Sequence, residues 1–444
     1  MVLIFRIFSF ISIEKVFGYF GDVIGDVFFP PNQSENAAII ESYAVFGGAF
    51  LARPIGGLLL GYIGDKYGSK VALILSIFLM AFPTFLMGCL PSYESIGPYA
   101  IVLLTIVRLL QGCSVGGQLM TSLVFTLENH PKSQWRFYGS LVLATANFGS
   151  LLGGVAATVM RTLFTHDQLY SWGWRIPFLM GIFVSVSGFY LRGHGGEEQE
   201  QKPVDEKSKD HIMSLVLSPG NRRPVLSLCM MNMLWSSGFH LSFVWMAIYM
   251  TDLIQKPVPG SFVINSANLF ISCCLLLPVV GYLSDKISRK VLMAFSAVGM
   301  LFFCPLIVML IGKGDAAIAF AAQLVLGILV SFWGGPMMAL YVETFDPRVR
   351  LTSIAIGYNV AQPSIGAIAP SLATYFVDRF SPNAPGYIFS AIACISLTGL
   401  LIVRPSEMVT LYGDYDSLPT APTTPDSDDD MSDNDEAKTK IIAV

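Results

Sequence analysis

The sequence predicts an all-α membrane protein of twelve transmembrane helices, arranged as two pseudo-symmetric six-helix bundles. Three observations predict this fold class. Hydrophobic residues make up 53% of the chain and charged residues only 13%, and the mean hydropathy is +0.61. Apolar segments long enough to cross a bilayer recur along the chain. A short charged motif appears twice, 220 residues apart, which indicates a duplicated half.

The low content of charged residues indicates what surrounds this protein. A soluble domain carries about a quarter charged residues, and this chain has too few to cover a surface of its size. The lipid bilayer must therefore surround most of it. The net charge of -4 is concentrated at the end of the chain, since residues 405–444 hold ten acidic and two basic side chains. The remainder is only mildly basic, so nothing predicts a nucleic-acid partner.

Eleven apolar segments read directly as helices. They lie at about 39–63, 70–90, 98–127, 136–164, 174–192, 223–253, 262–284, 290–312, 315–342, 350–377 and 385–403. The twelfth is expected within the first 30 residues, where Asp22 and Asp26 interrupt the apolar pattern. We therefore expect an atypical first helix.

Two polar stretches divide the chain into parts. Residues 193–222 are charged and predict a cytoplasmic linker between a bundle at 1–192 and a second at 223–403. Residues 404–444 form an acidic tail, rich in Ser, Thr and Pro, which is predicted to be disordered. Ser427 and Ser432 precede acidic residues, a pattern that suits an acidophilic kinase, although solvation alone also explains the tail.

Lys and Arg fix the expected orientation. The loops after every second helix, together with the tail, hold 18 of the 27 basic residues. Positive loops remain on the cytoplasmic side. Both termini are therefore predicted to be cytoplasmic, with the plasma membrane as the expected location.

The duplicated motif follows the second and the eighth predicted helices. It comprises Gly61, Asp65, Lys66 and Lys70 in the first copy and Gly281, Asp285, Lys286, Arg289 and Lys290 in the second. Ordinary positive loops would explain the basic residues but not the paired Asp and Gly. An Asp at the end of one helix can lie at the positive N-terminus of a neighbouring helix. We expect such contacts to form a cytoplasmic gate.

A second correspondence extends the repeat. Glu343 and Arg350 stand at the ends of the tenth and eleventh predicted helices, and Glu128 and Arg136 hold the matching places in the first half. Salt bridges that open and close the gate are one interpretation. Simple loop charges are the other.

Charged residues within the membrane are functional candidates by default, because their burial costs about 2.5–3.5 kcal/mol. Arg108 lies deep in the fourth predicted helix. Its planar guanidinium could hold a substrate carboxylate or a proton-binding carboxylate, whereas a purely structural Arg would bond to backbone carbonyls. Arg53, with Pro54, Gly56 and Gly57, predicts helix packing near the gate.

Other polar residues are candidates for the substrate or proton pathway. They are Gln118, Asn147, Asn359, His240, Asp22 and Asp26. His240 could titrate near neutral pH, but a lone His among aromatic residues also suits hydrogen-bonded packing. The amides could bind substrate, or bond to each other across helices. The two Asp residues could exchange protons or simply be solvated at the entrance.

These motifs resemble those of the major facilitator superfamily. Three runs narrow the resemblance to its metabolite:proton symporter branch, which includes proline/betaine and 2-oxoglutarate transporters. The runs are Arg53-Pro-Ile-Gly56-Gly57, Arg108 to Gly117, and Trp172-Gly-Trp-Arg175-Ile-Pro177-Phe. The resemblance covers about residues 16–403. It departs at Phe10–Ile13, where the family carries a polar stretch, and at Gln118, where the family carries an acidic residue that would bind a proton.

The resemblance implies secondary active transport by alternating access. The expected substrate is a small carboxylate-bearing or zwitterionic metabolite, with the proton as coupling ion. A membrane sensor or scaffold that retains the transporter fold is the alternative. The sequence has no nucleotide-binding loop, no cluster with metal-ligand spacing and no nucleophile–base pair. We therefore expect no enzyme activity, no cofactor and no metal.

Overall fold

The computed structural model describes residues 20–30, 35–183, 185–186, 188–189, 212–366 and 368–403. Every regular element within these residues is helical. The start of the first predicted helix, most of the linker and the tail with Ser427 and Ser432 lie outside the described residues. The chain divides into two compact units, Met1–Arg404 and Pro405–Val444, and only the first is described below.

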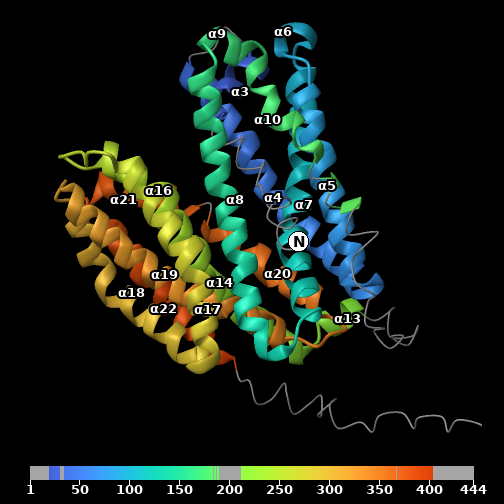
Figure 1. Ribbon diagram of the computed structural model, residues 1–444, viewed down its shortest axis with the longest axis vertical. Helices are drawn as coiled ribbons and strands as arrows, with labels where there is room; N and C mark the ends of the chain where they lie inside the picture. Colours follow the sequence, from blue (N-terminus) through green and yellow to red (C-terminus); the bar gives the residue numbers. More distant parts are fainter. Residues whose placement is uncertain are drawn as a thin grey trace, which may run out of the picture. The chain divides into compact units, whose positions relative to one another are not determined.

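The first half contains six principal helices, shown in blue to green in Figure 1. They are α3 (Gly21–Phe28), α4 (Glu35–Tyr67), α5 (Ser69–Cys89), α7 (Tyr99–Glu128), α8 (Trp135–Leu163) and α10 (Arg175–Leu179). Short elements connect them: α6 (Tyr93–Ile96), η1 (Lys132–Gln134), α9 (His166–Gln168) and η2 (Leu169–Gly173).

The second half follows a short helix, α13 (Ile212–Val216), and three of the six spans described here contain π-helical turns. The first span comprises α14 (Pro219–Phe239), η3 (His240–Trp245), α15 (Met246–Ile248) and η4 (Tyr249–Leu253), and the second comprises α16 (Ser261–Leu269), η5 (Phe270–Leu276) and α17 (Leu277–Lys286). The third is α18 (Arg289–Ile311), and the fourth is α19 (Ala316–Thr344), which has Pro336 inside it. The fifth comprises α20 (Arg350–Ala361), η6 (Gln362–Gly366) and α21 (Ile368–Arg379), and the sixth is α22 (Ala384–Ile402).

Most helix bounds within the described residues lie within about four residues of the sequence prediction. The exceptions are α10, which covers only the start of the predicted segment 174–192, and the linker. The sequence places the linker up to residue 222, whereas α13 lies inside it and α14 begins at Pro219. Pro at the first helical position is pre-organised for a helix start because its φ is fixed. The polar composition of this stretch hid that local signal.

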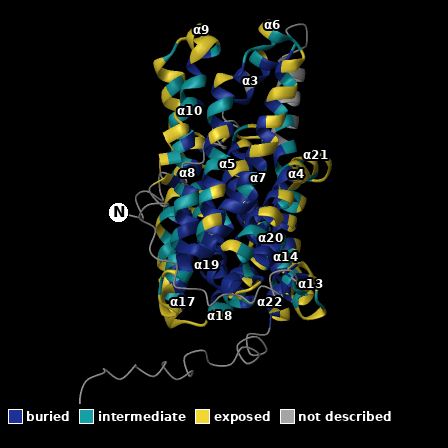
Figure 2. Cartoon of the chain, turned by 90° about the vertical axis from the view of Figure 1, so that its right-hand side faces the viewer, coloured by how far each residue is buried: buried dark blue, intermediate teal, exposed yellow. Residues whose placement is uncertain are grey.

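The exposed surface is suited to lipid. Large apolar side chains such as Val263, Phe302 and Leu401 are about 70% exposed, while the residues between the helices are buried (Figure 2). Seven helices in the described part of the chain are long and apolar enough to cross a membrane. An exterior of this kind is stable only where hydrocarbon replaces water.

Close backbone approach joins α4 to α7. A side chain at Gly56, Gly112 or Gly116 would collide with the backbone of the facing helix, at Cys113, Ala49 and Arg53 respectively. Small residues allow membrane helices to pack at this distance, where dispersion forces are strongest. The Gly-rich runs of the sequence thus form the seam of the first half.

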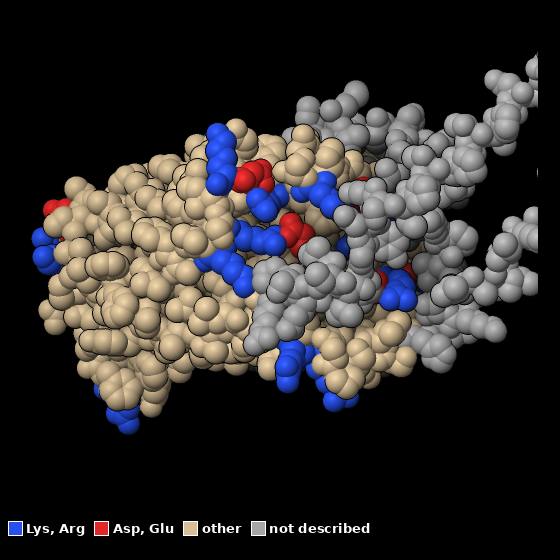
Figure 3. Space-filling model, turned by 90° about the horizontal axis from the view of Figure 1, so that it is seen from below, with Lys and Arg blue, Asp and Glu red and all other residues tan. Residues whose placement is uncertain are grey.

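The two halves meet where α4 contacts α20 and where α8 contacts α17 and α19. This junction lies at the lower end of the molecule in Figure 1. We call it the charged end, defined by Asp65, Glu128, Arg136, Asp285 and Arg350. Lys, Arg, Asp and Glu side chains gather on this face in Figure 3.

Candidate functional site

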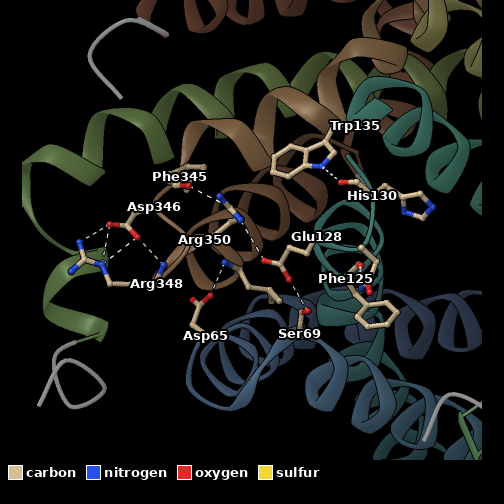
Figure 4. A network of polar contacts seen from close by, with 12 residues as sticks. Asp65, Ser69, Phe125, Glu128, His130, Trp135, Phe345, Asp346, Arg348 and Arg350 are labelled. Carbon is tan, nitrogen blue, oxygen red and sulfur yellow. Dashed lines mark hydrogen bonds and ion pairs between the residues drawn. The ribbon is translucent and has the colours of Figure 1, made fainter. Parts of the chain in front are cut away.

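A carboxylate and a helix start connect the halves at the charged end (Figure 4). Asp65, near the end of α4, accepts hydrogen bonds from the backbone N–H groups of Leu351 (2.9 Å) and Thr352 (2.8 Å). These groups lie in the first turn of α20, where N–H donors have no partner within the helix and the helix dipole is positive. Gly61, one turn earlier, allows the Thr352 backbone to approach α4 closely.

The surroundings of Asp65 act on its pKa in opposite directions. Asp65 lies beyond the apolar segment 39–63 of α4. Burial beneath α20 raises the pKa of its carboxyl to about 7. The hydrogen bonds from Thr352 and Leu351 and the positive charge of Arg350 lower it by less. The contact therefore changes its protonation near neutral pH.

An ion pair lies beside this contact. Glu128, the last residue of α7, is 3.4 Å from the Arg350 guanidinium of the opposite half. The other carboxylate oxygen of Glu128 accepts a hydrogen bond from the Ser69 hydroxyl at 2.8 Å. Only 11% of the Arg350 side chain and 23% of the Glu128 side chain are exposed, so water screens this pair less than it would a surface pair.

The second copy of the motif uses the same residue types differently. Arg136 of α8 donates to Asp285 at 3.4 Å and to the Ser284 carbonyl at 2.9 Å. Glu343, the counterpart of Glu128, pairs instead with Arg289 of its own half. The pseudo-equivalent of Arg289 is Ser69, which is neutral. Glu128 consequently reaches across to the opposite half, whereas Glu343 does not.

The lysines of the motif lie mainly against neighbours in their own half. Lys66 donates to the Tyr62 hydroxyl at 3.1 Å. Lys286 lies 5.1 Å from the centre of the Tyr282 ring, and Lys290 donates to the Val403 carbonyl at 2.6 Å. Lys70 stands in the first turn of α5 and is half-buried. The gate contacts across the halves described above use acidic and Arg side chains.

A second, uncharged contact lies further into the membrane. Asn359 of α20 donates to the Gly116 carbonyl of α7 at 2.6 Å and to the Ala355 carbonyl at 2.8 Å. A side chain at Gly57 would collide with the Asn359 amide. The structure thus places Asn359, predicted for the substrate pathway, in the junction between the halves.

The Arg53 run forms part of the α4–α7 seam. The Arg53 side chain is buried, and its guanidinium lies 4.0 Å from the centre of the Phe50 ring. Pro54 stands inside α4. Gly56 provides the close approach described above. Helix packing, one of the predicted roles, therefore has direct contacts in the structure.

Arg108 is almost completely buried, with 1% of the residue exposed. It donates to the Gln111 side chain at 2.8 Å, and Gln111 donates to the Thr84 hydroxyl of α5 at the same distance. Thr84 in turn donates to the Met80 carbonyl. These hydrogen bonds hold one side of the Arg108 guanidinium, which is always charged, inside the first half.

The remaining predicted pathway residues come from several helices. Gln118 of α7 and Asn147 of α8 are buried. The Asn147 amide nitrogen has no hydrogen-bond partner among the described residues. His240 opens η3, and its Nδ1 lies 2.7 Å from the Ser236 carbonyl. Asp26 is exposed on α3, and the side chain of Asp22 lies outside the described residues.

Sequence reasoning missed several residues that complete these contacts. Gln111, Thr84 and Ser69 are common polar residues whose partners are distant in sequence. Comparison of the two motif copies could have singled out Ser69, because the second copy has Arg289 there. Arg175 was noted only as part of a motif. It donates to the carbonyls at the end of α5, at Gly88 and Leu90, and so caps that helix.

An apolar groove lies apart from these residues, and the described residues form no metal cage. Within the described residues, no group of three or more His, Cys, Asp or Glu could hold a metal ion. A groove of about 550 Å³ lies between α21 and α22 and is lined by apolar residues such as Leu372, Phe376 and Ile388. It contains none of the predicted pathway or gate residues.

Comparison with known proteins identifies the family. The sequence model of the Major Facilitator Superfamily matches residues 16–355 and 261–414. The alpha-ketoglutarate permease of Escherichia coli (strain K12) is 31% identical over 370 residues, which cover 83% of this chain and 82% of the permease. The chain belongs to the Major Facilitator Superfamily. It is an integral multi-pass membrane protein of the transporter type and not an enzyme.

One further relative and one solved structure are also similar to this chain. The glycine betaine/proline/ectoine/pipecolic acid transporter OusA of Dickeya dadantii (strain 3937) is 29% identical over 87% of this chain and 79% of its own length. The solved structure of the proton:xylose symporter XylE, bound to 6-bromo-6-deoxy-D-glucose, has a TM-score of 0.69. It is 18% identical and covers 90% of this chain and 93% of XylE. The predicted fold and resemblance are confirmed, and the sensor interpretation gains no support.

One distance reports whether the charged end is closed. Ser133 of the first half and Ser288 of the second are exposed at this end. Cysteines at these two positions, in a chain whose native cysteines are replaced, can carry spin labels. The label distance lengthens when the two halves separate there.

Asp65→Ala is expected to open the charged end. The substitution leaves the Leu351 and Thr352 N–H groups without their acceptor, at a cost of about 1–3 kcal/mol for each group that stays dry. The population with a long label distance should rise about tenfold. Asp285→Ala is the matched control and should change it less than about threefold, because Asp285 accepts one bond at 3.4 Å. Equal effects of the two variants would contradict this assignment.

Closure at the charged end should also depend on pH through Asp65. The pKa of about 7 in the closed contact lies above the ordinary value, which a solvated Asp65 would regain after opening. The closed form therefore binds more protons than the open form, so low pH stabilises the closed form. Its population should fall as pH rises from 6 to 8, despite the neighbouring Glu128 and Arg350. A slope that persists unchanged in Asp65→Ala would assign the effect to another group.

Ser69→Arg should weaken the junction by copying the second motif. An Arg at position 69 would take Glu128, as Arg289 takes Glu343, and Arg350 would lose its partner. The open population should increase about twofold to fivefold, the range of a partly exposed ion pair. Ser69→Ala leaves Glu128 available and serves as control. The same label distance measures both variants, and a shift in the Ala variant alone would refute the argument.

Proposed function

We propose that the chain is a secondary active transporter of a small carboxylate-bearing or zwitterionic metabolite, coupled to protons and working by alternating access. The observation that carries the proposal is the buried Arg108. An always-charged guanidinium is costly inside a membrane helix. Its two-pronged geometry suits a carboxylate.

The names of the relatives support a carboxylate. Alpha-ketoglutarate, glycine betaine, proline, ectoine and pipecolic acid, which appear in the names of two relatives, all carry at least one carboxylate group. The Arg108 side chain is already positioned by Gln111 and Thr84. A positioned cation loses less rotational freedom on binding.

The second half offers the complementary chemistry for a zwitterion. Three aromatic rings lie near one another where α14 leads into η3. The ring centre of Phe239 is 6.0 Å from that of Trp235 and 5.7 Å from that of His240, within the range of aromatic contacts. Aromatic faces attract organic cations such as quaternary ammonium groups. A cation site in this half and Arg108 in the other would let one zwitterion engage both halves.

Proton coupling is proposed from the acidic residues of the first helix. Asp26 is exposed on α3, and Asp22 lies four residues earlier. Gln118 stands where the resembling branch carries an acid, so we assign proton uptake to these two carboxylates. His240 is a further candidate that the sequence predicts for this pathway.

Alternating access requires a contact that forms in one state only. The bonds of Asp65, Glu128 and Asn359 join the two halves and would all break if the charged end opened. We assign the charged end to the cytoplasm because the basic loops lie there. The plasma membrane location, the cytoplasmic termini and phosphorylation of Ser427 or Ser432 by a kinase belong to the same proposal.

Uptake into proteoliposomes tests the function and Arg108 together. Labelled 2-oxoglutarate, proline and glycine betaine would be offered with and without an inward proton gradient. We expect gradient-driven accumulation of at least one compound. Arg108→Ala should reduce kcat/KM by about tenfold to a hundredfold, the order expected when a charged hydrogen bond to substrate is lost, and Arg108→Lys should recover part of it. Arg379→Ala, an exposed site, should transport normally.

The outcomes separate the parts of the proposal. Uptake that only equilibrates would refute proton coupling and retain facilitated diffusion. Normal uptake by Arg108→Ala would refute the role of Arg108. No uptake by folded protein would refute transport of this substrate class.

A further inference from the structure

The short helix α13 lies at the charged end, beside α20 (Figures 1 and 2). Two residues, Leu217 and Ser218, separate it from α14. It therefore belongs by connection to the second half. It lies outside every motif described above, as a short apolar run that follows the charged part of the linker.

One face of α13 is buried. Ile212 and Val216 are each 3% exposed and form a cluster with Val349, the residue before α20. Their spacing of four residues places them on the same side of the helix. On the other side Met213 is 37% and Leu217 is 56% exposed. The helix thus packs inward as a small amphipathic unit.

A hydrogen-bonded Asn fixes α13 to α20. Asn221 donates to the Val216 carbonyl at 3.1 Å and to the Ser353 hydroxyl at 2.8 Å. Ser353 lies in the first turn of α20, next to the Thr352 N–H that binds Asp65. These bonds lie within the second half, so α13 moves with α20.

The same cluster reaches the first half through Tyr62. This Tyr of α4 packs against the cluster, and α13 contacts α4 directly. The Lys66 ammonium donates to the Tyr62 hydroxyl and lies 5.4 Å from its ring centre. Asp65 follows Tyr62 by three residues, which places both on neighbouring parts of one helix face.

The repeat supplies an internal comparison. Tyr282 and Lys286 occupy the equivalent positions in the second copy and make the same cation–π contact, at 5.1 Å. Tyr282, however, is 54% exposed, whereas Tyr62 is only partly exposed against the cluster. The difference between the copies is the helix that covers one Tyr and not the other.

We propose that α13 is a clasp that holds the charged end closed by packing Ile212 and Val216 against Tyr62 of the opposite half. The apolar contact exists only while α4 and α20 are together. It therefore adds to the stability of the closed form and is lost on opening. The proposal makes Tyr62, Ile212 and Val216 positioning residues of the transport cycle and rests on the proposed alternating access.

The two tyrosines provide the test. Tyr62→Ala removes a cross-half contact and should raise the population with a long Ser133–Ser288 label distance by about threefold to tenfold, since truncating a part-buried aromatic residue removes a substantial contact. Tyr282→Ala removes the same side chain where no clasp lies and should leave the population unchanged. Equal shifts in both variants, or none in Tyr62→Ala, would overturn the proposal.

A second pair of variants tests α13 itself. Val216→Ser should shift the label distance in the same direction as Tyr62→Ala, and combining the two should add little, because both remove one contact. Leu217→Ser on the exposed side should have no effect. Thermal unfolding of each variant shows whether the bundle is intact. Full additivity would separate Val216 from Tyr62 and refute the clasp.

These readouts do not depend on transport. If the wild-type chain transports none of the offered compounds but Tyr62→Ala still lengthens the label distance, the clasp stands and the proposed substrate class fails. If transport is normal but Tyr62→Ala leaves the label distance unchanged, the clasp fails and the proposed substrate class stands.

Discussion

The acceptance of two α20 N–H groups by the Asp65 carboxylate is the interaction on which the junction of the two halves depends. It uses donors that a helix start cannot satisfy by itself, so the first half completes the hydrogen bonding of the second. Glycine at position 61 permits the approach, and the Glu128–Arg350 pair lies beside it. The Asn359 amide joins the halves further along α20, and α13 packs against the neighbouring Val349 and Tyr62. Each of these contacts requires the halves to be together.

The duplicated motif is symmetric in sequence and asymmetric in contact. Asp65 binds a helix start, whereas Asp285 accepts a bond from Arg136. The turns also differ, since Gly68 has a φ of 101° and Ser288 a φ of -52°. A single change of residue type, Ser69 against Arg289, redirects the neighbouring Glu. The two copies are therefore similar in sequence, and a few differences in residue type accompany different contacts.

The sequence predicted the helices and the superfamily because both depend on patterns that are local or repeated. Long apolar segments and a charged loop require no knowledge of distant contacts. The partners of Asp65 could be expected in kind, as a helix start, but not by number. Tyr62, Ser69 and Gln111 escaped notice because their partners lie far away in the chain. The helix α13 escaped notice because its apolar run is only a few residues long and directly follows the charged residues 193–211.

The glycine seam between α4 and α7 has a mechanical consequence. No side chains lie between the facing backbones at Gly56 and Gly116, so no change of rotamer can absorb a displacement there. The close contact couples the two helices along the seam. Asp65 lies near one end of α4, and Arg108 lies in the first half of α7. We therefore expect a displacement at the charged end to be passed through the seam toward the buried cation.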